Sequence, residues 1–576
     1  MESQEPTLTR QERRRKRARR RHRQQLGGLA VFLAVVAAAA ALLNLPAVST
    51  KRAATSLPRT TTLPRTTAPT LRPAPPIQLA ATSLGPVGIR SAAIAAENQL
   101  PGTTAWMIKG APSTGTIDGF ADRNYVANGD TFGLYVSTTA PSFHVVAYRM
   151  GWYRGAGARE IWSSGEFRGV LQPACPVIAA TNTVECSNWS KGLTVTINSS
   201  WPPGDYLLKL VGSGNEQAYV PMTLWDPASH AAYLVVNRSM TEQGWDTYGG
   251  YDFYQGLGPC LLDHYSYPPC NRARVVSLDR PYVAGNGSSD FLDNEYPLIR
   301  WMERRGLDVT YATDITLDEH PAFAAQHRAW LSLDHDETWT YNELRAAKTA
   351  AATAGTNIVF FSGAAIVRHA RLQASPLGPD REIVDYRNAA EDPARLLGDP
   401  HQVTGNSWDQ AQTAFTGEMY SGLIPPGKPQ VPLVVADGSS WLFKGTGLQT
   451  GSAIPAAVGS DFDHINPRVA IPSNVEVLGH SPIPPGLGYT SSQTWNGYNY
   501  SDFTYYTVPG SKAGVIDTGD TTFITNLLPC PASAASCPAA TLTTMVGNIL
   551  WLFGQGPAGV LQPSVPNWQS IRPYGS

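Results

Sequence analysis

The chain has 576 residues, which at about 100 to 200 residues per domain predicts two or three domains. Hydrophobic residues make up 42% and charged residues 15%, with 52 Gly and 46 Pro, so the composition excludes a coiled coil and favours strands and loops. Residues 1–80 hold fifteen Lys/Arg and three Glu (+12), which leaves −13 for residues 81–576. A body this acidic offers no electrostatic footprint for nucleic acid, so we expect no such partner.

The chain begins with a basic segment, residues 1–25, followed by an apolar run. Residues 26–43 are uncharged and mostly Ala, Leu and Val, which predicts a membrane-spanning helix over residues 26–46. The preceding basic residues indicate that the body lies outside the cytoplasm, as in a single-pass protein of the cell membrane with extracytoplasmic C-terminal domains. A cleaved signal peptide is the alternative, because Ala47-Val48-Ser49 offers a small-residue cleavage site.

Residues 47–84 have the composition of a Pro/Thr-rich stalk. Leu57-Pro58-Arg59-Thr60-Thr61 recurs as residues 63–67, and six prolines between Pro58 and Pro76 favour extended conformations without a packable face. A disordered linker is the alternative. Either one predicts a spacer ahead of the body.

The six cysteines fall into three close pairs with no zinc-like spacing. Six cysteines allow fifteen connectivities, but short loops close at the least entropic cost, so pairing between neighbours is favoured. We therefore expect disulfides, which suits a location outside the cytoplasm. The predicted pairs are Cys175–Cys186, Cys260–Cys270 and Cys530–Cys537.

Residues 85–228 alternate short β-branched and aromatic runs with turn signals, which predicts a β-sandwich domain. Turns such as Trp201-Pro202-Pro203-Gly204 separate these runs. The expected strands are 131–136, 144–148, 193–197, 206–210 and 219–224.

From residue 229 the pattern changes to alternating strands and helices. Apolar strands are predicted at 231–237, 309–312, 329–333 and 357–361, with helices at 295–305 and from Thr340 to Gly355. This alternation predicts a three-layer α/β domain over residues 229–560 with a mostly parallel sheet, followed by a C-terminal tail, 561–576. Ligand sites of such domains lie beyond the carboxyl ends of the strands.

The strand end at Asp334-His335-Asp336-Glu337 is the most informative one. Four consecutive ionisable residues after an apolar strand indicate a solvent-filled pocket, a cation site, or the cap of the helix that begins near Tyr341. A metal site would use Glu337 as an oxygen ligand and His335 as a ligand or its partner. The strand ends near Trp245 and Tyr282 carry further polar and aromatic residues.

Several motifs occur in one order along the chain. They are Tyr148-Arg149-Met150-Gly151-Trp152-Tyr153-Arg154, Asp279-Arg280-Pro281-Tyr282, Asn294-Glu295-Tyr296-Pro297, His335-Asp336-Glu337 and Phe360-Phe361-Ser362-Gly363. In these motifs, residues 85–555 resemble the large (beta) subunit of N,N-dimethylformamidase. The resemblance implies a glutamine-amidotransferase-like fold for the α/β domain and hydrolysis of a small amide at a mononuclear iron.

The resemblance also implies roles for individual residues. The iron lies between two tyrosines and a glutamate beside a histidine, so Tyr282 and Glu337 would be metal ligands, and Glu337 and His335 would be catalytic. The second tyrosine position holds Trp245, whose indole cannot bind a metal, and Ala364 and Arg368 are further departures. Trp245, Tyr248 and Arg371 would bind substrate.

Two hypotheses follow, and the sequence leaves open whether the chain is an enzyme. The first is a metal-assisted hydrolase of C–N (amide) bonds with a divergent site and a small-molecule amide substrate. The second is a non-catalytic protein that binds a cell-envelope glycan or has a structural role, and a homo-oligomer is compatible with both. The second hypothesis rests on aromatic residues that could stack on sugars or belong to a core, namely Tyr489, Trp495, Tyr498, Tyr500, Phe503, Tyr505 and Tyr506.

Overall fold

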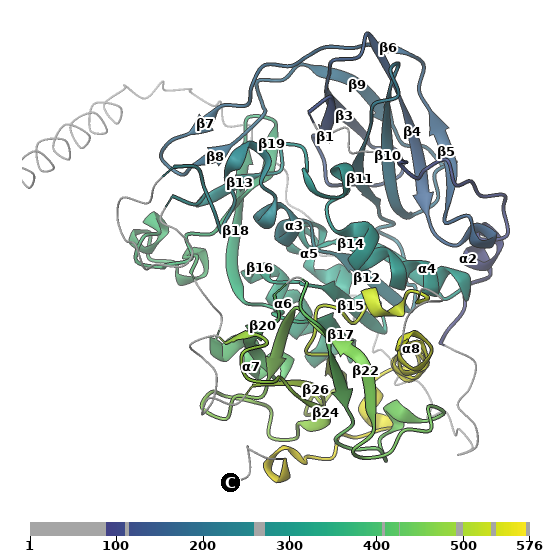
Figure 1. Cartoon of the computed structure of the whole chain (residues 1–576), viewed down its shortest axis with the longest axis vertical. Helices are drawn as coiled ribbons and strands as arrows, with labels where there is room; N and C mark the ends of the chain where they lie inside the picture. Colours follow the sequence, from purple (N-terminus) through teal and green to yellow (C-terminus); the bar gives the residue numbers. More distant parts are fainter. Residues whose placement is uncertain are drawn as a thin grey trace, which may run out of the picture. The chain divides into compact units, whose positions relative to one another are not determined.

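The computed structural model describes residues 88–109, 115–258, 271–405, 409–425, 427–490, 499–530 and 537–571 (Figure 1). The chain divides into two compact units, Met1–Ala80 and Ala81–Ser576, of which the first lies wholly outside the described residues. The architecture below is that of the second unit.

The first described strands form a β-sandwich. One sheet has the order β1-β3-β9, and the other has the order β2-β11-β10-β4-β5 with β6 paired to β4. Phe132, Val145 and Leu208 belong to one buried core between them, as the alternating apolar pattern predicts. The strands are β1 Ile117–Ala121, β2 Tyr125–Val126, β3 Thr131–Thr138, β4 Ser142–Met150, β5 Ala158–Ser163, β6 Phe167–Arg168, β9 Lys191–Thr196, β10 Gly204–Gly212 and β11 Gln217–Leu224.

A seven-stranded sheet of order β14-β12-β15-β17-β27-β26-β24 forms the centre of the following part. Its first five strands run parallel, while β26 and β24 are antiparallel to their neighbours. The apolar strands at the centre of this sheet are buried on both faces, as expected for a parallel sheet. The strands are β12 Tyr233–Asn237, β14 Val309–Thr313, β15 Ala329–Asp334, β17 Asn357–Ser362, β24 Glu476–Pro482, β26 Tyr500–Thr507 and β27 Gly514–Asp517.

The predicted three-layer α/β fold class is wrong. The described residues are mostly β-strands distributed over seven sheets, with few and mainly short helices. Between β17 and β27, the described residues do not make the predicted kind of helical crossover. They form strands of the smaller sheets, two strands of the central sheet and one eight-residue α-helix, because Gly and Pro interrupt this stretch repeatedly. The helices are α2 Ala92–Glu97, α3 Ser239–Trp245, α4 Tyr296–Arg304, α5 Asp314–Glu319, α6 Tyr341–Thr349, α7 Asp409–Thr416 and α8 Ala539–Gly554.

One of the predicted strand ends belongs to a smaller sheet rather than to the central one. The strand before Tyr282 is β13, and it pairs antiparallel with β19 in a four-stranded sheet rather than joining the parallel strands. Tyr282 therefore does not follow a strand of the central sheet. These remaining strands are β7 Val177–Ile178, β8 Thr183–Val184, β13 Val275–Ser277, β16 Thr338–Thr340, β18 Arg368–Ser375, β19 Gly378–Val384, β20 Met419–Leu423, β21 Val431–Val434, β22 Ala453–Val458, β23 Asp461–His464 and β25 Tyr489–Thr490.

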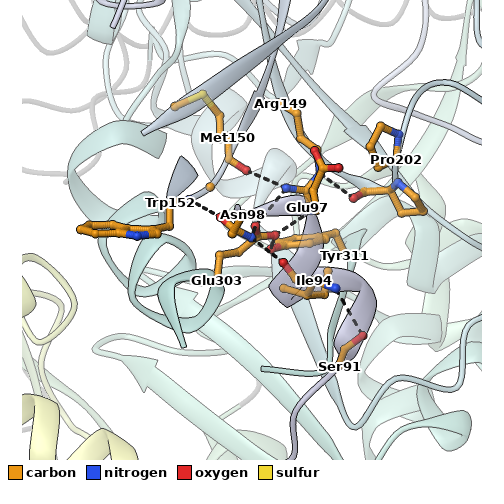
Figure 2. Close-up of polar contacts among 12 residues, drawn as sticks. Ser91, Ile94, Glu97, Asn98, Arg149, Met150, Trp152, Pro202, Glu303 and Tyr311 are labelled. Atoms are coloured by element: carbon orange, nitrogen blue, oxygen red, sulfur yellow. Dashed lines mark hydrogen bonds and ion pairs between the residues drawn. The ribbon is translucent and has the colours of Figure 1, made fainter. Parts of the chain in front are cut away.

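A buried ionic network joins the sandwich to the central sheet and its helices (Figure 2). Arg149 on β4 donates to both carboxylate oxygens of Glu303 on α4, at 2.7 and 2.9 Å, and its Nε donates to the carbonyl of Pro203 at 2.9 Å. Asn98 after α2 and Tyr311 on β14 also donate to Glu303. Arg149, from the motif at residues 148–154, thus has a structural role in this network, which we call the Arg149 network.

Two of the three predicted disulfides are confirmed. Cys175–Cys186 and Cys530–Cys537 are bonded, with Cα–Cα distances of 4.5 and 5.7 Å. The predicted Cys260–Cys270 pair lies outside the described residues. The first bond fixes a loop of the sandwich beside β7 and β8, and the second precedes α8.

The predicted membrane-spanning helix and single-pass membrane localisation are corrected. Within the described ranges, no helix has the length and apolar character needed to cross a membrane. The predicted segment, residues 26–46, and the stalk lie outside those ranges.

Candidate functional site

The turn after β15 carries the ionisable residues that the sequence singled out. Asp334 ends the strand in a left-handed conformation, with φ of +49°, and pairs with the buried Arg238 at 2.8 Å. The N-cap of α6 is Thr340, whose hydroxyl accepts the Glu343 amide at 3.1 Å. Glu337 is therefore not needed as a cap, and its carboxylate is engaged elsewhere.

Glu337 is buried, with 4% of its surface exposed, and lies at the centre of a polar cluster. Its Oε1 accepts from the Arg368 Nε at 2.8 Å, and its Oε2 accepts from the Trp245 Nε1 at 3.2 Å. The Tyr254 hydroxyl donates to the same Oε2. The His335 Nε2 lies 3.7 Å from this oxygen, within ion-pair distance. We call these five residues the Glu337 cluster.

The electrostatics of the cluster favour an ionised carboxylate. Burial opposes ionisation of Glu337, but Arg368, His335 and Arg387 together lower its pKa to about 2. For Tyr254, burial and the neighbouring Glu337 raise the pKa well above the usual range. The resting cluster therefore holds a carboxylate and a protonated phenol.

Aromatic stacking positions the wall of the cluster. The indole of Trp245, at the end of α3, stacks on the Tyr254 ring at 3.6 Å and 12°, and lies 5.5 Å from the His335 ring. Trp245 is 39% exposed, whereas Tyr254 is buried. The cluster thus reaches solvent along the Trp245 and His335 side.

Two guanidinium groups lie beside the phenol of Tyr254. Arg387 lies over the ring at 4.2 Å and Arg368 at 5.7 Å from its centroid. Arg387 is itself buried, close to the carboxylate of Asp385. Buried Arg387 and partly buried Arg368 thus lie near two carboxylates, those of Glu337 and Asp385.

The structure distributes the predicted site residues among four places. Trp245, His335 and Glu337 come together in the Glu337 cluster. Arg371 pairs with Asp392 at 2.6 Å, and Tyr248 packs beside the aromatic group that contains Trp189. Tyr282 lines an interior cavity instead.

That cavity has a volume of about 50 Å³ and lies between the sandwich and the residues after β12. Glu242 from α3 lines it together with Asp205, Asn237, Glu295 and Tyr282, whereas Glu337 does not. Glu242 Oε1, Asp205 Oδ2 and Asn237 Oδ1 have no hydrogen-bond partner among the described residues. Burial raises the pKa of Glu242 to about 8 and that of Asp205 to about 7. We call this group the acidic cavity.

In the Glu337 cluster the groups that could bind an iron, Glu337, Tyr254 and His335, are turned toward one another rather than toward a shared vacant position. Both oxygens of Glu337 already accept hydrogen bonds, one of them from a guanidinium, and Trp245 has no metal-binding atom. A further cation at Glu337 would also be repelled by Arg368 and Arg387, whose charges already act on this carboxylate. No group of three or more His, Cys, Asp or Glu side chains in the described part of the chain is arranged to hold a metal ion.

Sequence reasoning missed Tyr254, Arg368 and Arg387. Tyr254 lies in an irregular segment after α3, and Arg387 follows β19, so neither stands at a predicted strand end. Arg368 was counted only as a departure from the motif. Arg368 lies 31 residues from Glu337, so no local sequence pattern indicates their ion pair.

The fold and the cluster define a β-rich globular protein with a buried, charged site beyond a strand of its central sheet. The chain belongs to the family described as N,N-dimethylformamidase beta subunit-like, C-terminal, whose model matches residues 144–535. This match confirms the resemblance drawn from the motifs. It covers most of the sandwich and the whole Glu337 cluster.

Other comparisons add little. No curated protein matches the chain. Among solved structures, a cycloisomaltooligosaccharide glucanotransferase from Paenibacillus sp., complexed with cycloisomaltoheptaose, is 12% identical with a TM-score of 0.12. The alignment covers 22% of this chain and 17% of that one, so the chain spans a small part of that enzyme's length.

Proposed function

We propose that the chain hydrolyses the C–N bond of a small amide at the Glu337 cluster, without a bound iron. The observation that carries the proposal is the His335–Glu337 pair: an imidazole 3.7 Å from a buried carboxylate whose pKa is lowered to about 2. Family membership supports the reaction class. The proposal replaces the iron of the sequence-based hypothesis by the chain's own cations.

In this reaction His335 acts as the general base. Its imidazole takes a proton from a water molecule, whose oxygen attacks the carbonyl carbon, and Glu337 stabilises the resulting imidazolium. The imidazolium then returns the proton to the nitrogen as the C–N bond breaks. The products are a carboxylic acid and an amine, and the proton count closes without an external reagent.

Tyr254 and Arg368 are positioning residues. They bind the two oxygens of Glu337 and so fix the orientation of the carboxylate toward His335. Arg368 and Arg387 also place positive charge where an amide oxygen would gain negative charge in the transition state. The exposed edge of Trp245 provides an apolar wall for a small substrate.

The test uses the full chain and a panel of small formamides and acetamides, with amine release as the readout. We expect His335→Gln and Glu337→Gln each to lower kcat by about 100-fold or more, which is the usual contribution of a positioned base. His144→Gln and Glu166→Gln are matched controls, because they change an exposed His–Glu pair of the sandwich at 3.0 Å.

Unchanged amine release in both Glu337 cluster variants would contradict the proposal. So would a complete absence of amine release across the panel. Thermal unfolding of each variant separates loss of catalysis from loss of folding, and the controls should match the parent chain in both measurements.

The glycan-binding alternative gains no specific support. Phe503, Tyr505 and Tyr506 are buried, as core aromatics are, while Trp495 and Tyr498 lie outside the described residues. We therefore propose the hydrolase alone.

A further inference from the structure

A group of arginines without carboxylate partners lies on and beside α4. Arg300 lies in the middle of this helix, Arg304 ends it and Arg305 is its C-cap, and Arg90 lies close enough to Arg305 to act on its pKa. Among the described residues, none of the four forms an ion pair, in a body that carries −13. Arg300 donates to the carbonyl of Gly155 at 3.4 Å and also interacts with the Tyr296 side chain.

Two tryptophans hold these arginines in place. The guanidinium groups of Arg300 and Arg304 lie 4.4 and 4.6 Å from the Trp152 ring, and that of Arg305 lies 3.7 Å from the Trp301 ring. Trp152 lies at the margin of the Arg149 network, where its amide is held by Asn98 (Figure 2). The arginines are therefore stacked on a rigid part of the molecule rather than free in solvent.

The arrangement has an electrostatic cost that the fold does not relieve. Partial burial and the neighbouring Arg304 and Arg90 lower the pKa of Arg305 to about 10. The negative end of a helix favours basic residues in its last turn, which accounts for one arginine such as Arg304. The helix dipole does not account for four neighbouring arginines. A bound anion would reduce the repulsion among them.

A groove of about 450 Å³ opens beside three of these arginines. Arg300, Arg304 and Arg305 line it together with Leu527 and Leu528, and Leu528 is 38% exposed. Pro297 and Ala540 add apolar surface. The groove thus combines a cationic edge with an apolar floor.

We propose that this groove binds an amphiphilic anion, a phosphate or carboxylate carried on an apolar body. Guanidinium groups bind the oxygens of such anions through charge-assisted hydrogen bonds, and the leucines receive the apolar part. The site is separate from the Glu337 cluster and does not depend on the function proposed there.

The experiment titrates the full chain with decyl phosphate, inorganic phosphate and decanol, following tryptophan fluorescence and the thermal unfolding temperature. Decyl phosphate binds more tightly than inorganic phosphate or decanol, because only it uses both sides of the groove. In the double variant Arg304→Gln/Arg305→Gln, its affinity falls by about tenfold or more. Arg395→Gln, which changes an exposed arginine elsewhere, is the matched control and leaves the affinity unchanged.

Further arms distinguish the sources of the anion. If the parent chain binds vesicles that contain phosphatidic acid and the double variant does not, the anion is a lipid headgroup. If the parent chain binds soluble decyl phosphate but not the vesicles, the anion is a soluble amphiphile. Either result supports the shared chemistry. Equal affinity in the parent and double variant, or no saturable binding of decyl phosphate, overturns the proposal. Unfolding temperatures without ligand show that the variants are folded.

Discussion

The Arg149 network and the acidic cavity are both buried polar regions at the sandwich, yet their hydrogen bonding differs. Glu303 receives donors on both oxygens, from Arg149, Asn98 and Tyr311. In the acidic cavity, Glu242 and Asp205 each keep a buried oxygen without a partner among the described residues. A satisfied network stabilises a fold, whereas an unsatisfied buried acid costs free energy as soon as it ionises.

The largest expected effect comes from a substitution that disrupts the Arg149 network. Glu303→Gln leaves the guanidinium of Arg149 buried without its counter-charge, so we expect the free energy of unfolding to fall by about 3 to 5 kcal/mol. Chemical denaturation at pH 7 measures this. A loss below about 1 kcal/mol, as for exposed ion pairs, would show that the network does not hold the sandwich.

The second effect has the opposite sign and depends on pH. Because burial raises the pKa of Glu242 from 4.5 to about 8, the folded chain holds this proton more tightly than the unfolded chain. Between these two values, the stability of the parent chain therefore falls as pH rises. Glu242→Gln stays neutral, so we expect a gain that grows from pH 4.5 to 8 and reaches about 1 to 3 kcal/mol.

Denaturation of the parent and the Glu242→Gln variant at pH 5 and pH 8 checks this prediction. Glu166→Gln, at an exposed position, is the control and should show no such dependence. A change in stability that is equal at both pH values would mean that the pKa of Glu242 is the same in the folded and the unfolded chain, and would contradict the prediction.

The third prediction compares two tyrosines, and its Tyr282 variant has the smallest expected effect. Tyr311 donates to Glu303 at 2.7 Å, so Tyr311→Phe should cost about 1 to 3 kcal/mol by leaving that acceptor underused. Tyr282 lines the acidic cavity and makes no hydrogen bond among the described residues, so Tyr282→Phe should change stability by less than about 0.5 kcal/mol. Equal costs in thermal or chemical unfolding would remove the distinction between the regions.

The sequence predicted local features of this fold better than its long-range contacts. The buried strands β12, β15 and β17, the Thr340 cap and the Gly355 C-cap follow from patterns within a few residues. The fold class was wrong because the chain after β17 returns as small antiparallel sheets, and no local pattern specifies which strands pair.

The candidate site was predicted in part for the same reason. Glu337 and His335 follow a recognisable strand, and Trp245 ends a short helix, so their positions could be argued locally. Tyr254 and Arg368 reach Glu337 from 83 and 31 residues away. The resemblance and its place after a predicted strand assign Tyr282 to the same site, but β13 pairs with β19 outside the central sheet, and Tyr282 lines the acidic cavity.

The most direct test of the central claim is to measure amide hydrolysis and bound iron in the same samples of the full chain. Samples prepared with added iron and samples treated with a chelator should release amine at the same rate, because Arg368 and Arg387 supply the positive charge at Glu337. Iron should stay well below one atom per chain in both. Amine release that rises in proportion to bound iron, approaching one atom per chain, would contradict the account.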